Sequence, residues 1–199
     1  MKNISVIGLG SMGYGIAQSL IRSGYNVYGQ DKNTVQQKKL IEEGGLDAEI
    51  PFGDLDAVII VVLNEAQTRD IIFGEEGIAE KLKKDTLVIV CTTVSPNFAK
   101  EMAAACENKE LLYLDAPISG GSIKSSQGKL SYMVSGSKNA LIAAKPILDS
   151  TSETVFEFGE VVGSGSAMKA VNQMLAGVHI AAMAEAITFG ITQGIEPER

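Results

Sequence analysis

Short runs of consecutive apolar residues alternate along this chain with longer segments in which apolar residues recur every three or four positions. Consecutive apolar residues are typical of strands buried on both faces, whereas the wider spacing is typical of helices. We expect strands at residues 4–7, 26–30, 57–63, 86–91, 111–114, 130–134 and 154–158. We expect helices at residues 11–23, 34–43, 70–84, 97–108 and 138–148, the third of them broken by glycines. This alternation predicts an α/β fold with a doubly wound, mainly parallel sheet.

The end of the chain departs from this alternation. From residue 164 to about residue 190 the sequence predicts a helix that is longer than the others and apolar on most of its faces. Its uncharged part, residues 170–184, is too short to span a bilayer, so we expect a buried helix and no membrane contact. We place domains at residues 1–162 and 163–199. Because the sheet cannot cover all the apolar side chains of this helix, we expect a homo-oligomer, a dimer, formed through it.

A glycine-rich motif lies between the first expected strand and the first expected helix. Its sequence, Gly8-Leu9-Gly10-Ser11-Met12-Gly13, has the GxGxxG pattern. In this position the first glycine permits a tight turn, the second lets a pyrophosphate approach the backbone, and the third lets the helix pack against the strand. The helix N-terminus adds free N–H groups and the positive end of a dipole. The motif predicts a Rossmann-type dinucleotide-binding domain.

An acidic residue follows at the end of the second expected strand. Asp31 lies 18 residues after Gly13, close to the ~20-residue offset at which a carboxylate binds the adenosine ribose. Its charge would repel the 2′-phosphate of NADP, which favours NAD, although the adjacent Lys32 keeps NADP possible. The alternative is that Asp31, together with Asn33 and Thr34, only caps the helix that follows.

Charge and cysteine content narrow the classes of function. The formal net charge is −7 and the basic residues form no long run, which argues against a nucleic-acid partner. Cys91 and Cys106 have no metal-ligand spacing, so we expect two core thiols, no metal site and a cytoplasmic protein. The N-terminus lacks the features of a signal peptide.

Three further segments carry a resemblance to a known family. They are Thr92-Thr93-Val94-Ser95-Pro96, Asp115-Ala116-Pro117-Ile118-Ser119-Gly120-Gly121 and Gly163-Ser164-Gly165-Ser166-Ala167-Met168-Lys169-Ala170-Val171-Asn172-Gln173. With the glycine motif, they make the chain resemble the β-hydroxyacid dehydrogenases, such as 3-hydroxyisobutyrate and 6-phosphogluconate dehydrogenases, over residues 2–190. Residues 172–182 are most similar to the threonate type within that family. The resemblance implies NAD-dependent oxidation of a small hydroxy acid, such as threonate or 3-hydroxyisobutyrate.

The resemblance also implies which residues act on the substrate. In that family the Asp-Ala-Pro-x-Ser-Gly-Gly loop binds the substrate carboxylate, which implies this role for Ser119, Gly120 and Gly121. On the local sequence alone, an ordinary turn would explain them equally well. The lysine of the GxGxxxK segment is the family's general acid/base and corresponds here to Lys169, for which the alternative is a solvated lysine at a helix start. Asn172 lies on the same helical face and would orient the substrate.

Other residues are expected near the nicotinamide. The family's Thr-x-Ser-Pro loop implies this position for Thr93, and Leu63 with Asn64 ends a strand at the sheet edge where ligands of α/β folds gather. Either Thr93 or Asn64 could instead cap the next helix. His179, on the last helix, could be functional, although a lone histidine on an apolar helix is more often a packing residue.

Two other functions remain open at this point. Members of the family carry a further all-helical domain that closes the cleft, and we expect the chain to end within the first long helix of that domain. The chain could then bind its cofactor without turnover. The second possibility is an NADPH-dependent semialdehyde reductase, against which Asp31 argues.

Overall fold

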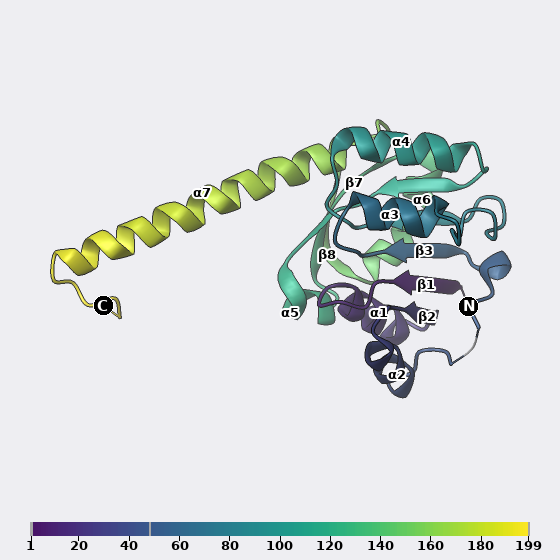
Figure 1. Ribbon diagram of the computed structural model, residues 1–199, viewed down its shortest axis with the longest axis horizontal. Helices are drawn as coiled ribbons and strands as arrows, with labels where there is room; N and C mark the ends of the chain where they lie inside the picture. The colour runs from purple at the N-terminus through teal and green to yellow at the C-terminus, as the bar shows by residue number, and fades with distance from the viewer. Residues whose placement is uncertain (1, 48, 199) are drawn as a thin grey trace.

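The computed structural model describes residues 2–47 and 49–198, and Figure 1 shows a layered α/β body from which one long helix projects. The strands are β1 (Asn3–Ile7), β2 (Asn26–Gln30), β3 (Ala57–Ile60), β4 (Leu87–Val90), β5 (Leu112–Asp115), β6 (Ile118–Ser119), β7 (Leu130–Gly136) and β8 (Ser152–Glu157). The helices are α1 (Gly13–Arg22), α2 (Thr34–Glu42), α3 (Glu65–Phe73), α4 (Pro96–Glu107), α5 (Gly121–Ser126), α6 (Lys138–Asp149) and α7 (Ser164–Thr192), with a 3₁₀ turn, η1, at Phe52–Asp54.

The strands form a mixed sheet in the order β2-β1-β3-β4-β5-β7-β6, with β8 paired to β7. The five strands from β2 to β5 are parallel to one another, β7 runs antiparallel to β5, and β8 is parallel to β7. The order reverses at β1, because the chain goes from β1 to β2 on one side and then returns to β3 on the other. The predicted doubly wound, mainly parallel sheet is therefore confirmed.

Successive residues of the central strands supply two separate hydrophobic cores. On β3, Ala57 and Ile59 pack with residues of α1 and α6, whereas Val58 and Ile60 pack with residues of α3 and α4. Both faces of these strands are therefore buried, which explains why they consist of consecutive apolar residues. The carboxyl ends of the parallel strands are the edge at which ligands of such sheets gather.

Two helices differ from the prediction. The helix expected at residues 70–84 is instead α3, which begins earlier because the side chain of Asn64 accepts a hydrogen bond from the N–H of Gln67 and so caps it, and which already ends at Phe73, before Gly74. The strand before it accordingly ends at Ile60 rather than at Leu63. Helix α5 was not predicted, because its Gly- and Ser-rich sequence resembles a turn. It is stabilised by packing on α1, where Ser125 Oγ donates to the carbonyl oxygen of Met12 at 2.5 Å.

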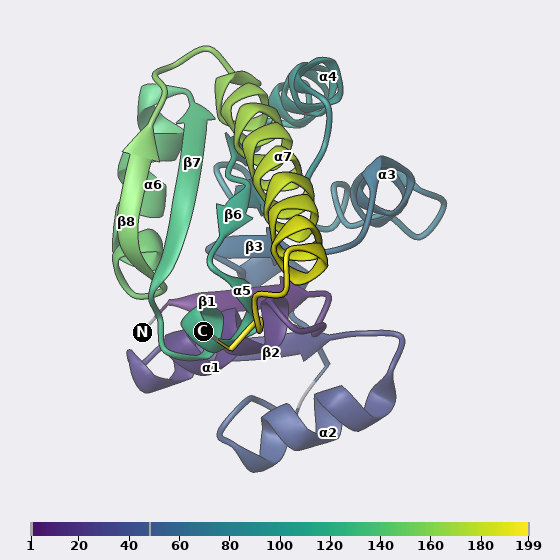
Figure 2. The same cartoon turned by 90° about the vertical axis from the view of Figure 1, so that its left-hand side faces the viewer.

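Helix α7 confirms the long final helix but not its predicted burial. It projects from the body in Figure 1 and therefore runs toward the viewer in Figure 2, and its only buried residues in the described chain are Gly165, Ser166 and Lys169. No described element packs against it beyond its first turns, so its apolar side chains face solvent. By length and composition alone α7 could cross a membrane, because an 18-residue window of it has a mean hydropathy of 1.6, a test that core helices of soluble proteins also pass. The boundary proposed before residue 163 stays a prediction.

Candidate active site

The glycine turn between β1 and α1 is built by close backbone contacts. Gly8 has a φ of +95°, and a Cβ on it would lie 2.1 Å from the carbonyl oxygen of Val61. A Cβ on Gly13 would lie 1.9 Å from the carbonyl oxygen of Gly8. Side chains are therefore excluded at both positions, and the turn brings the start of α1 against the end of β3.

Gly10 differs from these two glycines in facing open space. A Cβ on Gly10 would meet no atom within 4 Å. Among the described residues, the N–H groups of Gly10, Ser11 and Met12 have no hydrogen-bond acceptor. Unpaired N–H groups at a helix N-terminus, beside open space, suit the pyrophosphate of a dinucleotide.

The carboxylate of Asp31 lies directly beside this turn. It accepts one hydrogen bond from the N–H of Leu9 at 2.6 Å and another from the N–H of Asn33 at 2.7 Å. The cap of α2 is the side chain of Asn33, which accepts from the N–H of Val35. Each oxygen of Asp31 has accepted only one bond, which leaves acceptor capacity for a ribose hydroxyl.

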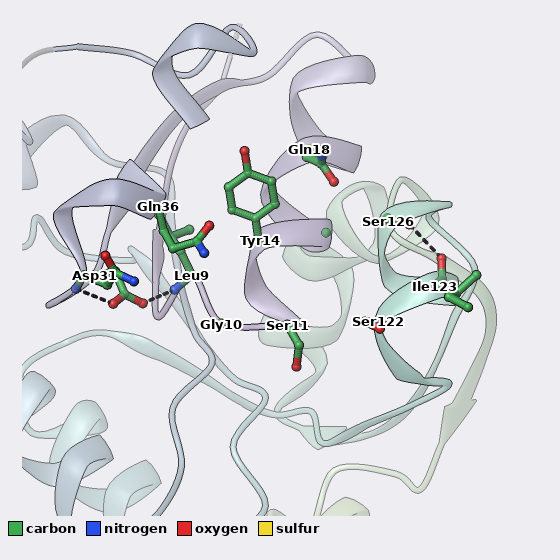
Figure 3. A pocket seen from close by; sticks show the side chains of 12 residues that line it. Leu9, Gly10, Ser11, Tyr14, Gln18, Asp31, Gln36, Ser122, Ile123 and Ser126 are labelled. Atoms are coloured by element: carbon green, nitrogen blue, oxygen red, sulfur yellow. Dashed lines mark hydrogen bonds between the residues drawn. The ribbon is translucent and has the colours of Figure 1, made fainter. Parts of the chain in front are cut away.

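A cavity of about 490 Å³ opens between this turn, α2 and α5 (Figure 3). Asp31 and Gln36 lie on one side of it, Tyr14 and Gln18 come from α1, and α5 forms the opposite wall in Figure 3. The cavity is lined by Leu9, Gly10, Ser11, Tyr14, Gly15, Gln18, Asp31, Asn33, Gln36, Ser122, Ile123 and Ser126. The glycine turn and Asp31 thus share one cavity, as their predicted roles require.

A second cavity, of about 390 Å³, lies on the other side of the same turn. It is lined by Met12, Val61, Val62, Leu63, Cys91, Thr92, Thr93, Ile118, Ser119, Gly120, Gly121 and Lys169. These residues follow β1, β3 and β4, belong to β6 and the turn after it, or lie on α7, so segments far apart in the sequence meet in one cavity. Ser11 and Met12 are consecutive, so the two cavities adjoin at the N-terminus of α1.

Lys169 is the basic residue of the second cavity. Only 7% of its surface is exposed, and its amine has no hydrogen-bond or ion-pair partner among residues 2–47 and 49–198. Desolvation by the surrounding residues lowers the pKa of this amine from its ordinary value. The solvated lysine considered as an alternative is therefore excluded for this chain.

The glycines that end the Asp115–Gly121 segment have backbone conformations that other residues rarely adopt. Gly120 has a φ of 133° and Gly121 a φ of 77°. With Ser119, they line the wall of the cavity that also holds Lys169. Backbone N–H groups there can approach an anion without side-chain obstruction, whereas an ordinary turn would not require this placement.

Several predicted residues lie outside this cluster. Asn64 caps α3 and lines neither cavity, and Asn172 is half-buried on α7 outside both linings. His179 is exposed, so it is not a core packing residue in this chain. Thr93 does line the second cavity, and the cap of α4 that was its alternative role is provided by Ser95.

A hydrogen-bond network that was not predicted holds the start of α7. Asp115 is fully buried at the end of β5 and accepts hydrogen bonds from Ser135, Gly163 and Ser166. The position of an acidic residue at the end of an apolar strand is the signal in the sequence that could have indicated it. The family motif implied a substrate-binding role for the end of the Asp115–Gly121 segment and no separate role for Asp115.

The chain matches two family descriptions. Residues 3–159 match the NAD-binding domain of 6-phosphogluconate dehydrogenase, and residues 163–199 match the NAD-binding region of NADP-dependent 3-hydroxyisobutyrate dehydrogenase. The second match includes α7, which is thus a helix of this family.

Known proteins are similar over nearly the whole chain. L-threonate dehydrogenase from Haemophilus influenzae is 44% identical over 97% of this chain and 65% of its own length. L-threonate dehydrogenase from Cupriavidus necator is 39% identical over 99% of this chain and 67% of its own length. The crystal structure of 3-hydroxyisobutyrate dehydrogenase from Salmonella typhimurium matches with a TM-score of 0.91 and 40% identity, over 98% of this chain and 69% of that one.

The chain spans about two thirds of the length of the curated relatives that it matches. The family descriptions, the relatives and the shared fold agree with one another and with the glycine turn. This chain belongs to the β-hydroxyacid dehydrogenase family and contains its NAD(P)-binding domain.

Proposed function

We propose that the protein oxidises a small hydroxy acid with NAD and that Lys169 is the general base of the reaction. The observation that carries this proposal is the second cavity, which brings Lys169 together with Ser119, Gly120 and Gly121 beside the N-terminus of α1. A desolvated amine and an anion-binding loop in one cavity suit a substrate that has both a hydroxyl and a carboxylate.

The loop provides the binding part of the reaction. The N–H groups of Gly120 and Gly121 and the hydroxyl of Ser119 are hydrogen-bond donors for the substrate carboxylate. Binding at this end fixes the distance between the hydroxyl-bearing carbon and the amine across the cavity. Much of the rate acceleration then comes from orientation.

Lys169 provides the proton transfer. Bound NAD would supply the hydride acceptor. As the hydroxyl O–H bond breaks, its proton passes to the neutral amine of Lys169 while the hydroxyl-bearing carbon loses its hydride and becomes a carbonyl. The amine must be neutral beforehand, and the lowered pKa of Lys169 favours that state.

The names of the relatives suggest the substrate class. Threonate and 3-hydroxyisobutyrate are both small acids that carry a hydroxyl group. Steady-state assays of the full-length protein with NAD and a panel of such acids test the proposal. NADH formation with one of them supports it. NAD binding without turnover of any acid would instead support a cofactor-binding module.

We expect Asp31→Asn to reduce the preference for NADH over NADPH. The substitution removes the charge that repels a 2′-phosphate and weakens a hydrogen bond to the ribose. The ratio of the affinity for NADH to that for NADPH should therefore fall about tenfold or more. Competitive titration of NADH against NADPH measures it, with Asp149→Asn on α6 as a charge-matched control. If the wild-type protein prefers NADPH, the assignment of Asp31 is wrong and the semialdehyde reductase is favoured.

We also propose that the 199-residue chain self-associates through α7. Met174, Ile180 and Phe189 are each at least 63% exposed on this helix, which leaves apolar surface for a partner. In light scattering we expect an oligomer that Ile180→Lys weakens and that Ile142→Lys, on the equally exposed Ile142 of α6, leaves intact. A monodisperse monomer at high concentration would refute this interface.

A further inference from the structure

The buried carboxylate of Asp115, at the end of β5, contacts the first turn of α7. This contact lies one helical turn before Lys169. Asp115 accepts hydrogen bonds from Ser135 Oγ at 2.9 Å, Gly163 N at 3.2 Å, Ser166 N at 2.9 Å and Ser166 Oγ at 2.6 Å. All four groups are donors, which is the pattern expected around an ionised carboxylate. Among the described residues no lysine or arginine forms an ion pair with it. The N-terminus of α7 therefore compensates its charge.

Ser135 extends this contact to β7. Its hydroxyl donates to Asp115 and accepts from the N–H of Gly165 at 3.1 Å. A Cβ on Gly165 would lie 2.3 Å from the carbonyl oxygen of Met133, so only glycine allows the helix to approach β7 this closely. Side chains from β5 and β7 thus satisfy three N–H groups at the start of α7 that the helix itself leaves unpaired.

This anchor determines where Lys169 lies. Lys169 follows Ser166 by three residues, so the two side chains lie on the same side of the helix, one turn apart. Beyond Lys169 no described residue of α7 is buried. Within the described chain, the direction of α7 and the place of the lysine in the second cavity therefore depend on the contacts of its first turn.

We propose that Asp115 is a positioning residue, which acts through Ser135 and Ser166 to hold the start of α7 so that Lys169 meets the substrate hydroxyl. The proposal rests on the function proposed above for Lys169. Asp115 does not line the second cavity, so the role proposed for it includes no contact with the substrate.

The positioning role has a signature in the lysine itself. Desolvation lowers the pKa of Lys169, so a shift of α7 that exposes the amine returns this pKa toward its ordinary value. The elements around the start of α7 also carry Tyr113 on β5, Tyr132 on β7, and Lys100, Glu101, Cys106 and Glu107 on α4, and Cys91 lines the second cavity with Lys169. Burial raises the pKa of Cys91 and of both tyrosines, so these three groups stay neutral near neutral pH.

The test compares Asp115→Asn, Ser166→Ala and Ser166→Thr in the full-length protein. One readout, independent of turnover, is the pH dependence of Lys169 acetylation by acetic anhydride in the cofactor-free protein, measured by peptide mass spectrometry. The other is steady-state kinetics with NAD and a hydroxy acid. We expect Asp115→Asn to move the acetylation midpoint to higher pH and to lower kcat by about 10–100-fold, with little change in the KM for NAD.

The Ser166 variants test the same contact without changing the charge. Ser166→Ala removes a hydrogen bond to Asp115, so we expect a lower kcat and an acetylation midpoint at higher pH, both by less than in Asp115→Asn. Ser166→Thr keeps the hydroxyl, and we expect it to restore both values.

Two results would overturn the proposal. One is an Asp115→Asn protein with the wild-type acetylation profile and kcat. The other, decisive if Asp115→Asn does not fold, is a Ser166→Ala protein with wild-type values in both readouts. If the wild-type protein oxidises no acid, the function proposed for Lys169 fails, and the acetylation profiles still decide whether Asp115 positions the lysine.

Discussion

Replacing Lys169 by alanine is expected to lower kcat for hydroxy-acid oxidation by about 10²–10⁴-fold, the usual contribution of a general base. The affinity for NAD should change little, because the amine acts on the substrate hydroxyl. Lys169→Arg should be as inactive as the alanine variant, since a guanidinium keeps the positive charge but does not release its proton. Steady-state kinetics of the full-length protein measure both effects.

A lysine outside the site provides the matched control. Lys145 on α6 is exposed and paired with Asp149, and Lys145→Ala should retain wild-type kcat. Wild-type turnover in Lys169→Ala would end the assignment of Lys169 as the general base. Substantial activity in Lys169→Arg would show that the reaction needs only a positive charge at this position.

The pH dependence of turnover should report the same amine. Burial lowers the pKa of Lys169 from its ordinary value. Oxidation requires the neutral amine, so kcat should rise with pH through this lowered pKa and stay high above it. The reverse reaction requires the protonated amine, so its kcat should fall over the same pH range.

The second large effect is expected from Gly13 and Gly10, two glycines of the turn between β1 and α1. In Gly13→Ala, the new Cβ would lie 1.9 Å from the carbonyl oxygen of Gly8, so the turn must shift, at a cost of about 1–3 kcal/mol or more in the free energy of unfolding. In Gly10→Ala, the new Cβ meets no atom within 4 Å, so stability should change by only about 0.5 kcal/mol or less. The same Cβ would project into the space proposed for the pyrophosphate and should weaken NAD binding at least about tenfold.

Denaturant unfolding and fluorescence titration with NADH separate these two outcomes. The expected pair is an unstable Gly13→Ala protein and a stable Gly10→Ala protein that binds NAD poorly. A Gly10→Ala protein with wild-type affinity would show that the phosphates do not approach this turn.

The parts of the fold that the sequence predicted well are those fixed by local patterns. The consecutive apolar residues of β3 and β4 are buried on both faces, and the GxGxxG spacing places Gly8 and Gly13 where backbones touch. Each of these features depends on neighbours along the chain or on an obligatory backbone conformation. The family motifs then predicted that Lys169 and Gly120 would share a site.

The features that were missed depend on contacts between distant segments. Helix α5 is Gly- and Ser-rich and is held by α1, which its local sequence does not reveal. Asp115 and Ser166 are 51 residues apart, and only the fold shows that one anchors the helix begun by the other. Residues 170–184 are exposed within the described chain, and their burial against a second copy stays a prediction.

The most direct test of the proposed mechanism is a crystal structure of the full-length protein with NAD and a hydroxy acid that it oxidises. We predict that the acid's carboxylate contacts Ser119 and the N–H groups of Gly120 and Gly121. We also predict that its hydroxyl oxygen lies within about 2.6–3.2 Å of the amine of Lys169. A substrate hydroxyl held by another residue, with Lys169 out of reach, would contradict the mechanism proposed for this chain.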